Sequence, residues 1–155
     1  MSSLDGYGAG SPSTTYASVM STYLSTGYHQ DRIALDEVFV KADGIAAKCS
    51  IPEYFVPADS LFHLTVPLAF VAVAQLAIVF AHLDNSLTQK VSEVFVHTIA
   101  MTCKRPVNKT EGIVVELVPT ARRRLTQGVF YQGRIDVDQG SFVGKGTFLL
   151  PLAVQ

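Results

Sequence analysis

The feature that most constrains the fold is an apolar segment in the middle of the chain, SLFHLTVPLAFVAVAQLAIVFAHL, which lies between two aspartates. The run from Leu64 to Leu83 is interrupted at only four positions, Thr65, Pro67, Gln75 and His82. It is long enough to cross a bilayer as one helix. However, acidic residues flank it and no Lys or Arg cluster is present to orient an insertion. Because an all-apolar helix belongs in lipid or inside a protein core, we expect a core helix and no membrane span.

Composition and charge narrow the class of protein. The 155 residues suit one domain with a sizeable core. Apolar residues make up 48% and charged residues 16%, which favours an oligomer that hides surface. A formal net charge of −1 argues against bulk nucleic-acid binding. We expect a flexible Ser/Gly-rich arm at residues 1–13 and a single domain at residues 14–155.

The two cysteines and the N-terminus indicate the chemical setting. Cys49 and Cys103 lie in strand-like runs, and neither has a C-x-x-C partner or metal-ligand spacing. We therefore expect both to be buried apolar residues, and we expect no metal and no cofactor. The polar N-terminus lacks the basic region of a signal peptide, so we expect a cytoplasmic protein.

The remaining segments predict one short helix and a set of strands. The helix is expected in TTYASVMSTYL and ends before Gly27. RIALDEVFVK and GIAAKCSI flank a turn at residues 42–44 and predict a hairpin. Four strand-like runs follow the apolar helix: KVSEVFVHTIAMTC, GIVVELV ending at Pro119, VFYQGRIDV and SFVGKGTFLLPL. This order predicts an α+β fold with an antiparallel sheet curled around the apolar helix.

This arrangement resembles the hotdog fold, in which a curved antiparallel sheet wraps a long helix, over residues 28–152. Two segments, FHLTVPLAFVAVAQLA and KRPVN, resemble more closely the FcoT-type long-chain fatty acyl-CoA thioesterases. That family carries a His at the helix start, a Gln twelve residues later and a Lys/Arg-Pro-x-Asn turn after the next strand. The matching residues are His63, Gln75, Arg105 and Asn108, and family tyrosines fall near Tyr28 and Tyr54.

The chain departs from this pattern at several polar positions. His63-Leu64-Thr65 replaces His-Phe-Asn, Ala74 replaces an Asn, and Leu68 replaces an acid. The 3-hydroxyacyl-ACP dehydratases carry an acid four residues before the helix Gln, where this chain has Val71. Acyl-ACP thioesterases carry Asp-x-x-x-His-x-Asn, which resembles Asp59 to Thr65 with Thr in place of Asn.

Four residues near the predicted helix start are candidates for thioester chemistry. His63 is a candidate general base, since a histidine titrates near neutral pH, or else it caps the helix or packs in the core. Asp59 would orient His63 or attack the thioester, or else it is a solvated loop acid. Thr65 would hold a water or donate to the carbonyl, or else it caps the helix. Tyr54 would donate to the same carbonyl, or else it is a packing aromatic.

Other residues are candidates for substrate binding. Gln75 is expected to be a buried amide that holds substrate or bonds to sheet backbone. The resemblance also suggests Tyr28 and Asn108. A local basic excess could hold the phosphates of CoA or an acidic carrier protein, or else it is a solvated strand edge. Its members are Lys104, Arg105, Lys109, Arg122, Arg123 and Arg124.

The function that the resemblance implies is hydrolysis of acyl thioesters, either acyl-CoA or acyl carrier protein, in fatty acid or polyketide metabolism. The helix N-terminus would polarise the thioester carbonyl through its unpaired amides. We expect a homodimer or higher homo-oligomer with sites built across the interface. Two alternatives stay open, a 3-hydroxyacyl-thioester dehydratase or isomerase-like enzyme and a non-catalytic acyl-thioester-binding protein.

Overall fold

A computed structural model describes residues 16–58 and 60–152 of the chain, so the expected arm at residues 1–13 lies outside the described residues. Two short helices and one 3-10 turn come first: α1 (Tyr16–Val19), α2 (Thr22–Ser25) and η1 (Gly27–Gln30). Two strands follow, β1 (Arg32–Val40) and β2 (Ile45–Glu53), and then the long helix α3 (Val66–Asp84). The last four strands are β3 (Phe95–Cys103), β4 (Ile113–Leu125), β5 (Gly128–Val137) and β6 (Phe142–Pro151).

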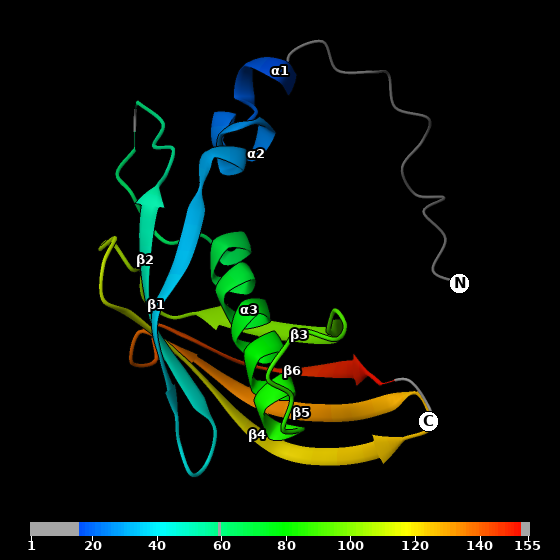
Figure 1. The fold of residues 1–155 in the computed structure, drawn as a ribbon. Coiled ribbons are helices and arrows are strands. Elements are labelled where there is room, and N and C mark those ends of the chain that lie inside the picture. Colours follow the sequence, from blue (N-terminus) through cyan, green and yellow to red (C-terminus); the bar gives the residue numbers. More distant parts are fainter. Residues whose placement is uncertain (1–15, 59, 153–155) are drawn as a thin grey trace, which may run out of the picture.

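The six strands form one antiparallel sheet in the order β1-β2-β4-β5-β6-β3. The sheet is curved, and α3 lies across its concave face (Figure 1). The short helices α1 and α2 lie beyond the N-terminal end of α3, whereas β4 and β5 pass its C-terminal end (Figure 1). The predicted α+β hotdog fold and the hairpin of β1 and β2 are therefore confirmed.

Alternation along the strands explains why the sheet has one apolar face. In β4, Ile113, Val115 and Leu117 are buried, whereas the residues between them are partly exposed. Successive side chains of a strand point to opposite faces, so these three residues form part of the layer under α3. The helix meets that layer with a buried face that is rich in small residues: Leu68, Ala69, Ala72, Val73, Leu76, Ala77 and Ala81. Alanines let the helix approach the strands closely.

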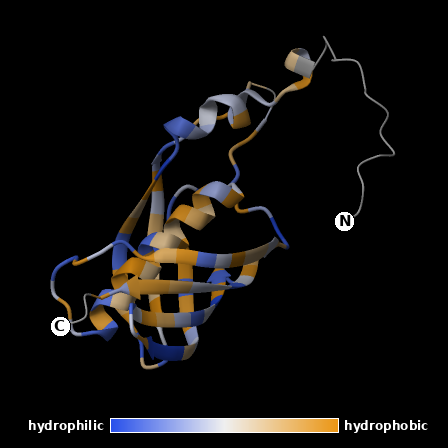
Figure 2. Cartoon of the chain, turned by 90° about the vertical axis from the view of Figure 1, so that its right-hand side faces the viewer, coloured by the Kyte–Doolittle hydropathy of each residue, from blue (hydrophilic) through white to orange (hydrophobic). Residues whose placement is uncertain are grey.

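The helix is covered on one side only. By length and composition α3 could cross a membrane, but its buried face makes it a core helix, as expected. It is coloured as hydrophobic along most of its length (Figure 2). Val66 and Val71 are nonetheless half exposed. Gln75 is also exposed, so the expectation of a buried amide is wrong, because the opposite side of the helix faces the sheet.

Three further expectations differ from the structure. The single N-terminal helix is wrong, since α1 ends at Val19 and Ser21 caps a separate helix, α2, through its side chain. The strand expected to end at Pro119 continues to Leu125, because Pro119 lies at an irregularity in the pairing of β4 with β5, where a missing N–H is tolerated. Cys49 is buried as expected, but Cys103 is exposed at the end of the edge strand β3.

The orientation of α3 predicts unequal effects at two neighbouring positions. Leu76 is 0% exposed, so Leu76→Ala should lower the free energy of unfolding by about 2–5 kcal/mol through lost burial and a residual cavity. Gln75→Ala, on the exposed side, should change it by less than about 0.5 kcal/mol. Urea unfolding measures both. Equal losses at the two positions would contradict this orientation of the helix.

Candidate active site

The first backbone amides of α3 are not capped by the side chain of the residue that precedes the helix. Thr65 occupies the N-cap position with extended backbone, but its side chain makes no capping hydrogen bond within the described residues. The first bond to its carbonyl oxygen comes from the Ala69 N–H at 2.9 Å. Pro67 has no N–H, so Val66 and Leu68 carry the two first-turn amides that have no acceptor within the helix. Together with the helix dipole they make this end suited to a negatively charged oxygen.

This helix end opens into a cavity of about 1090 Å³ between α2 and the loop that precedes α3. His63 and Thr65 both line the cavity, with Tyr23, Phe55 and Phe142 among the other wall residues. His63 is exposed, and its Nδ1 lies 3.5 Å from the carbonyl oxygen of Leu61. The structure therefore places the two principal candidates at one cavity.

The loop that carries His63 is held by the turn that the KRPVN segment forms. Asn108 Nδ2 donates to the Phe62 carbonyl oxygen at 3.0 Å, and the Leu64 N–H donates to the Val107 carbonyl oxygen at 2.8 Å. Tyr54 packs its ring against Phe62, with ring centroids 4.7 Å apart. Asn108 thus bonds to the backbone beside His63.

Two polar residues at this site, Tyr23 and Asp31, are not among those predicted from the sequence. Tyr23 donates its hydroxyl hydrogen to Asp31 Oδ2 at 2.7 Å, and its oxygen lies 2.7 Å from Thr65 Oγ1. The other carboxylate oxygen of Asp31 accepts the Phe55 N–H at 2.8 Å. Burial and the bond to Asp31 raise the pKa of Tyr23 to about 12. No local spacing could have revealed the contact, since Tyr23 and Thr65 are 42 residues apart.

Tyr28 belongs to a second cavity on the other side of this polar group. That cavity measures about 390 Å³, and its walls include Tyr23, Asp31 and Leu68 as well as Tyr28. The Tyr28 ring lies against His29, with ring centroids 4.0 Å apart. Tyr23 and Asp31 therefore form part of the wall of both cavities.

Asp59 lies outside the described residues. Two other predicted site residues are not brought to the cavity. Gln75 follows Thr65 by ten residues, which is about 15 Å along the helix axis. Arg105 donates through Nη2 to the carbonyl oxygen of Gln139 at 2.7 Å, in the turn between β5 and β6.

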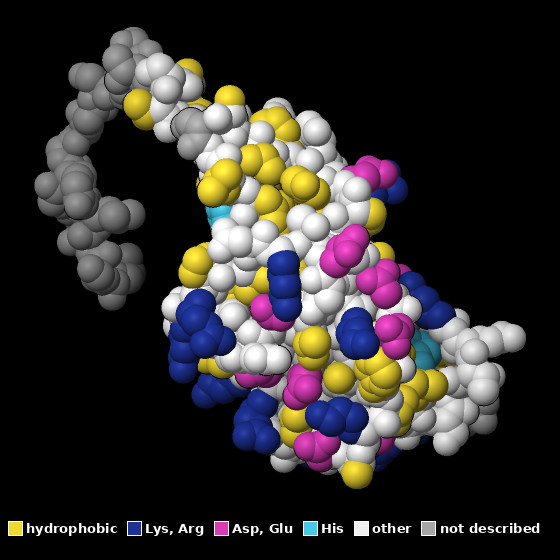
Figure 3. Space-filling model, turned by 90° about the vertical axis from the view of Figure 1, so that its left-hand side faces the viewer, with side chains coloured by type: hydrophobic (Ala, Val, Ile, Leu, Met, Phe, Trp, Pro, Cys, Tyr) yellow, Lys and Arg dark blue, Asp and Glu magenta, His cyan; other side chains and the backbone are white. Residues whose placement is uncertain are grey.

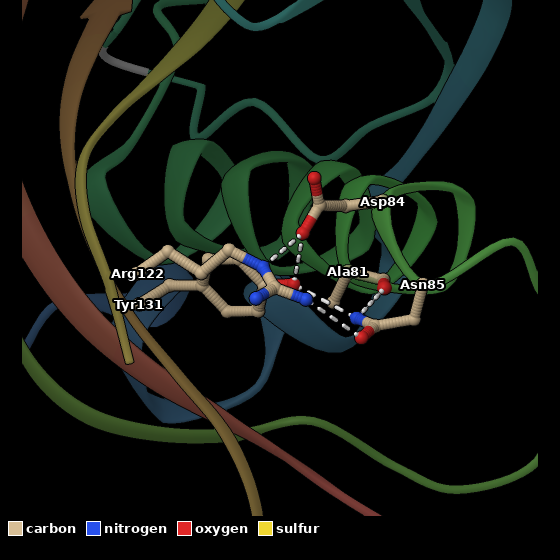
Figure 4. A network of polar contacts seen from close by, with 5 residues as sticks. All are labelled: Ala81, Asp84, Asn85, Arg122 and Tyr131. Carbon is tan, nitrogen blue, oxygen red and sulfur yellow. Dashed lines mark hydrogen bonds and ion pairs between the residues drawn. The ribbon is translucent and has the colours of Figure 1, made fainter. Parts of the chain in front are cut away.

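The arginines of β4 lie at the opposite end of α3, about 27 Å away along the axis. Arg122 donates through Nε to Asp84 Oδ2 at 2.7 Å and through Nη2 to Asn85 Oδ1 at 3.1 Å (Figure 4). The hydroxyl of Tyr131 donates to the same Asp84 oxygen at 2.5 Å and accepts from Asn85 Nδ2 at 2.8 Å. Asn85 also donates to the carbonyl of Ala81. These contacts attach the C-terminal end of α3 to β4 and β5.

The other basic residues do not gather into one patch. Lys109 pairs with Asp138 at 2.7 Å, and Arg123 lies over the ring of Phe130. On the face drawn in Figure 3, Lys and Arg side chains alternate with Asp and Glu side chains. The expected basic cluster is therefore dispersed, with part of it in ion pairs.

The space between α3 and the sheet is nearly filled. A cavity of about 20 Å³ lies there, lined by Phe70, Ile99 and neighbouring apolar residues, and it has room for about one water molecule. A larger open groove of about 930 Å³ runs between the start of α3 and the edge strand β3, with Val66, Phe70 and Met101 along it. The region under α3 is therefore a filled core and holds no tunnel among the described residues.

Within residues 16–58 and 60–152, no group of three or more His, Cys, Asp or Glu side chains is placed to hold a metal ion. The polar groups at the start of α3 are instead donors and acceptors suited to an organic substrate with a carbonyl group. These groups are the helix amides, one imidazole and the Tyr23 and Thr65 hydroxyls.

No protein-family model and no curated protein matches the chain. Solved structures resemble it in fold. A candidate thioesterase, yhdA from Lactococcus lactis, is 11% identical with a TM-score of 0.50, covering 86% of this chain and 100% of that one. Thioesterase HI1161 from Haemophilus influenzae is 20% identical with a TM-score of 0.48, covering 79% of this chain and 81% of that one. BH2602 from Bacillus halodurans, solved with CoA, is 15% identical with a TM-score of 0.41, covering 77% of this chain and 75% of that one. Identities this low describe a shared fold and not an activity.

The contacts at the C-terminal end of α3 predict a stability change at alkaline pH. Burial and the bond to Asp84 raise the pKa of Tyr131 to about 12 from its ordinary value of about 10. The neutral phenol therefore stabilises the fold fully below pH 10, and this stabilisation is lost as the pH rises from about 10 towards 12. Tyr131→Phe should lower the free energy of unfolding at pH 8 by about 1–2 kcal/mol.

The same variant should lose less stability than wild type between about pH 10 and pH 12, as measured by urea unfolding at each pH. Tyr54→Phe, at a ring that is 46% exposed, is the control and should follow wild type. Identical pH curves for Tyr131→Phe and wild type would show that this phenol does not contribute.

Proposed function

We propose that the chain hydrolyses acyl thioesters at the N-terminal end of α3. One observation carries the proposal: the uncapped N-terminal end of α3, at Val66 and Pro67, lines the same cavity as His63 and Thr65. A thioester carbonyl needs a donor for its oxygen and a group that activates water, and this cavity offers both kinds of group. The fold likeness to a candidate thioesterase agrees with this assignment but does not establish it.

In the proposed reaction the carbonyl oxygen accepts from the amides of Val66 and Leu68. His63 takes a proton from water while the water oxygen bonds to the carbonyl carbon. The C–S bond then breaks with its electron pair on sulfur, and the His63 imidazolium returns the proton to the thiolate. The products are a free acid and a thiol. Tyr54 and Asp59 are proposed to assist at the carbonyl and at His63.

The acyl chain is proposed to lie in the open groove between α3 and β3, because the core under α3 is filled. One side of this groove is open to solvent. Strand β3 is a sheet edge, Phe95 on it is 58% exposed, and Val66 of α3, which lines the groove, is half exposed. Exposed apolar surface next to an unpaired edge strand favours association. We propose that a second copy covers this surface in a homodimer and completes the site.

The substrate is proposed to be an acyl-CoA or an acyl carrier protein in the cytoplasm. Four further residues are proposed to contact the substrate: Tyr28, Gln75, Arg105 and Asn108. Those that lie outside the cavity of His63 are proposed to reach the substrate bound to the second copy. Arg123 and Arg124 are proposed to hold phosphate or an acidic carrier surface. Arg122 is the least available of the three, since its guanidinium is engaged by Asp84 and Asn85.

One observation favours the second candidate, a non-catalytic acyl-thioester-binding protein. His63 Nδ1 has only a long contact with the Leu61 carbonyl in its own loop, and no carboxylate orients the ring within the described residues. A dehydratase or isomerase-like reaction gains no such support. The position where dehydratases carry an acid is Val71, which lies half exposed on α3.

Thiol release from acyl-CoAs and acyl carrier thioesters, from C4 to C18, tests the proposed activity. Wild type should release thiol, and His63→Ala should reduce kcat by about 10²–10⁴-fold because the general base is lost. His97→Ala is the control, since His97 lies against Phe130 on the sheet face away from α3. It should retain wild-type kcat.

Release by neither protein, with acyl binding still detectable in calorimetry, would overturn the hydrolase and favour the binding protein. Equal kcat in wild type and His63→Ala would keep the hydrolase and remove His63 from its mechanism. A thermal melt of each variant separates a loss of activity from a loss of fold.

The proposed dimer predicts a position-dependent effect of a lysine. Val66→Lys places a charge at the exposed start of α3, in the groove beside β3, and it should shift the protein from dimer to monomer in sedimentation equilibrium. Val38→Lys, at a valine of similar exposure on the opposite edge strand β1, should leave the dimer intact. A wild-type protein that is monomeric at every concentration would contradict the proposal.

A further inference from the structure

The hydrogen bonds that join Asp31, Tyr23 and Thr65 at the start of α3 have a defined direction from donor to acceptor. Asp31, as a carboxylate, can only accept hydrogen bonds. Its Oδ1 accepts the Phe55 N–H at 2.8 Å and its Oδ2 accepts the Tyr23 O–H at 2.7 Å. Tyr23 has a single hydroxyl hydrogen, and Asp31 receives it. The 2.7 Å contact between the Tyr23 and Thr65 oxygens must therefore use the hydrogen of Thr65.

This direction determines what Thr65 presents to the cavity that it lines. The Thr65 hydrogen is engaged by Tyr23, and both lone pairs of Oγ1 are left over. The side chain does not use them to cap α3. Burial and the bond to Asp31 raise the pKa of Tyr23 to about 12, so the phenol keeps its hydrogen at neutral pH and the direction is maintained.

We propose that Asp31 and Tyr23 are positioning residues that hold the Thr65 hydroxyl as an acceptor for the attacking water. This inference rests on the hydrolase proposed above. A water that donates one hydrogen to Thr65 Oγ1 and the other to His63 turns its oxygen lone pair towards a carbonyl held at the helix amides. Of the two roles open to Thr65, water holding is selected. Donation to the carbonyl oxygen is excluded because the Thr65 hydrogen is already used.

The same bonds could serve only to attach α2 and the start of β1 to α3. Such a structural link would work with the hydrogens in either direction, whereas water holding depends on the direction. Asp31→Asn separates the two roles. The side-chain oxygen of the introduced asparagine would still accept from Phe55, and its NH₂ would donate to Tyr23. The Tyr23 hydrogen would then turn to Thr65, which would present its own hydrogen to the cavity.

The experiment is steady-state thiol release by wild type, Asp31→Asn and Tyr23→Phe on the best acyl thioester of the panel. Both variants should lose roughly tenfold in kcat with unchanged KM, which is the effect of one misdirected hydrogen bond. In a Thr65→Val background, Asp31→Asn should cause no further loss, because it acts through Thr65. Ser50→Ala is the matched control, since it removes a hydroxyl bond to Asp36 of 3.0 Å on the surface. It should retain wild-type kcat.

Wild-type kcat in Asp31→Asn would overturn the inference and leave only the structural link, while the hydrolase stands. A change in KM alone, or an additional loss in the Thr65→Val background, would overturn it as well. No thiol release by wild type would overturn the hydrolase and this inference together. If Tyr23→Phe fails to fold in a thermal melt, Asp31→Asn, which keeps every bond, decides the outcome.

Discussion

Helix α3 has to be buried, and this requirement determines how the sheet and the candidate site are arranged. An apolar helix of this length must be covered, and one curved sheet can cover only one side of it. Its buried face meets the concave face of the strands through alanines, leucines and a valine, and the Asp84–Arg122–Tyr131 contacts attach its far end. Because Val66 stays exposed in the groove beside the edge strand β3, the need to cover this helix also accounts for the proposed second copy.

The position of α3 also determines where chemistry can occur. Its C-terminal end is occupied by bonds to β4 and β5, whereas its N-terminal end opens into a cavity. Thr65 would ordinarily cap such an end, which would consume one amide donor. Here the Thr65 hydroxyl is bonded to Tyr23, so the helix amides and His63 are available to one ligand. The segment from α1 to η1 thus forms part of the cavity wall and also determines, through Tyr23, what the Thr65 hydroxyl binds.

The sequence predicts the fold well because the fold depends on local patterns. The turn at residues 42–44, the apolar run and the alternation in β4 each lie within a few neighbouring residues. The side of α3 that faces solvent could not be predicted, since an all-apolar helix has no polar stripe to mark it, and the expectation for Gln75 is wrong for that reason. The Tyr23–Thr65 contact and the Arg122–Asp84 pair join residues far apart in the chain, so no spacing reveals them. His63 and Thr65 line one cavity because both precede the same helix, and that proximity can be read from the sequence.

The most direct test of this account is a titration of the protein with a non-hydrolysable acyl thioether of CoA, followed by backbone amide shifts in nuclear magnetic resonance. A site at the helix N-terminus predicts the largest shift changes at Val66 and Leu68, with smaller ones at His63 and Tyr23. Changes confined to the Asp84 and Arg122 end of α3, or no change at the Leu68 amide under saturating ligand, would contradict a site at the helix N-terminus.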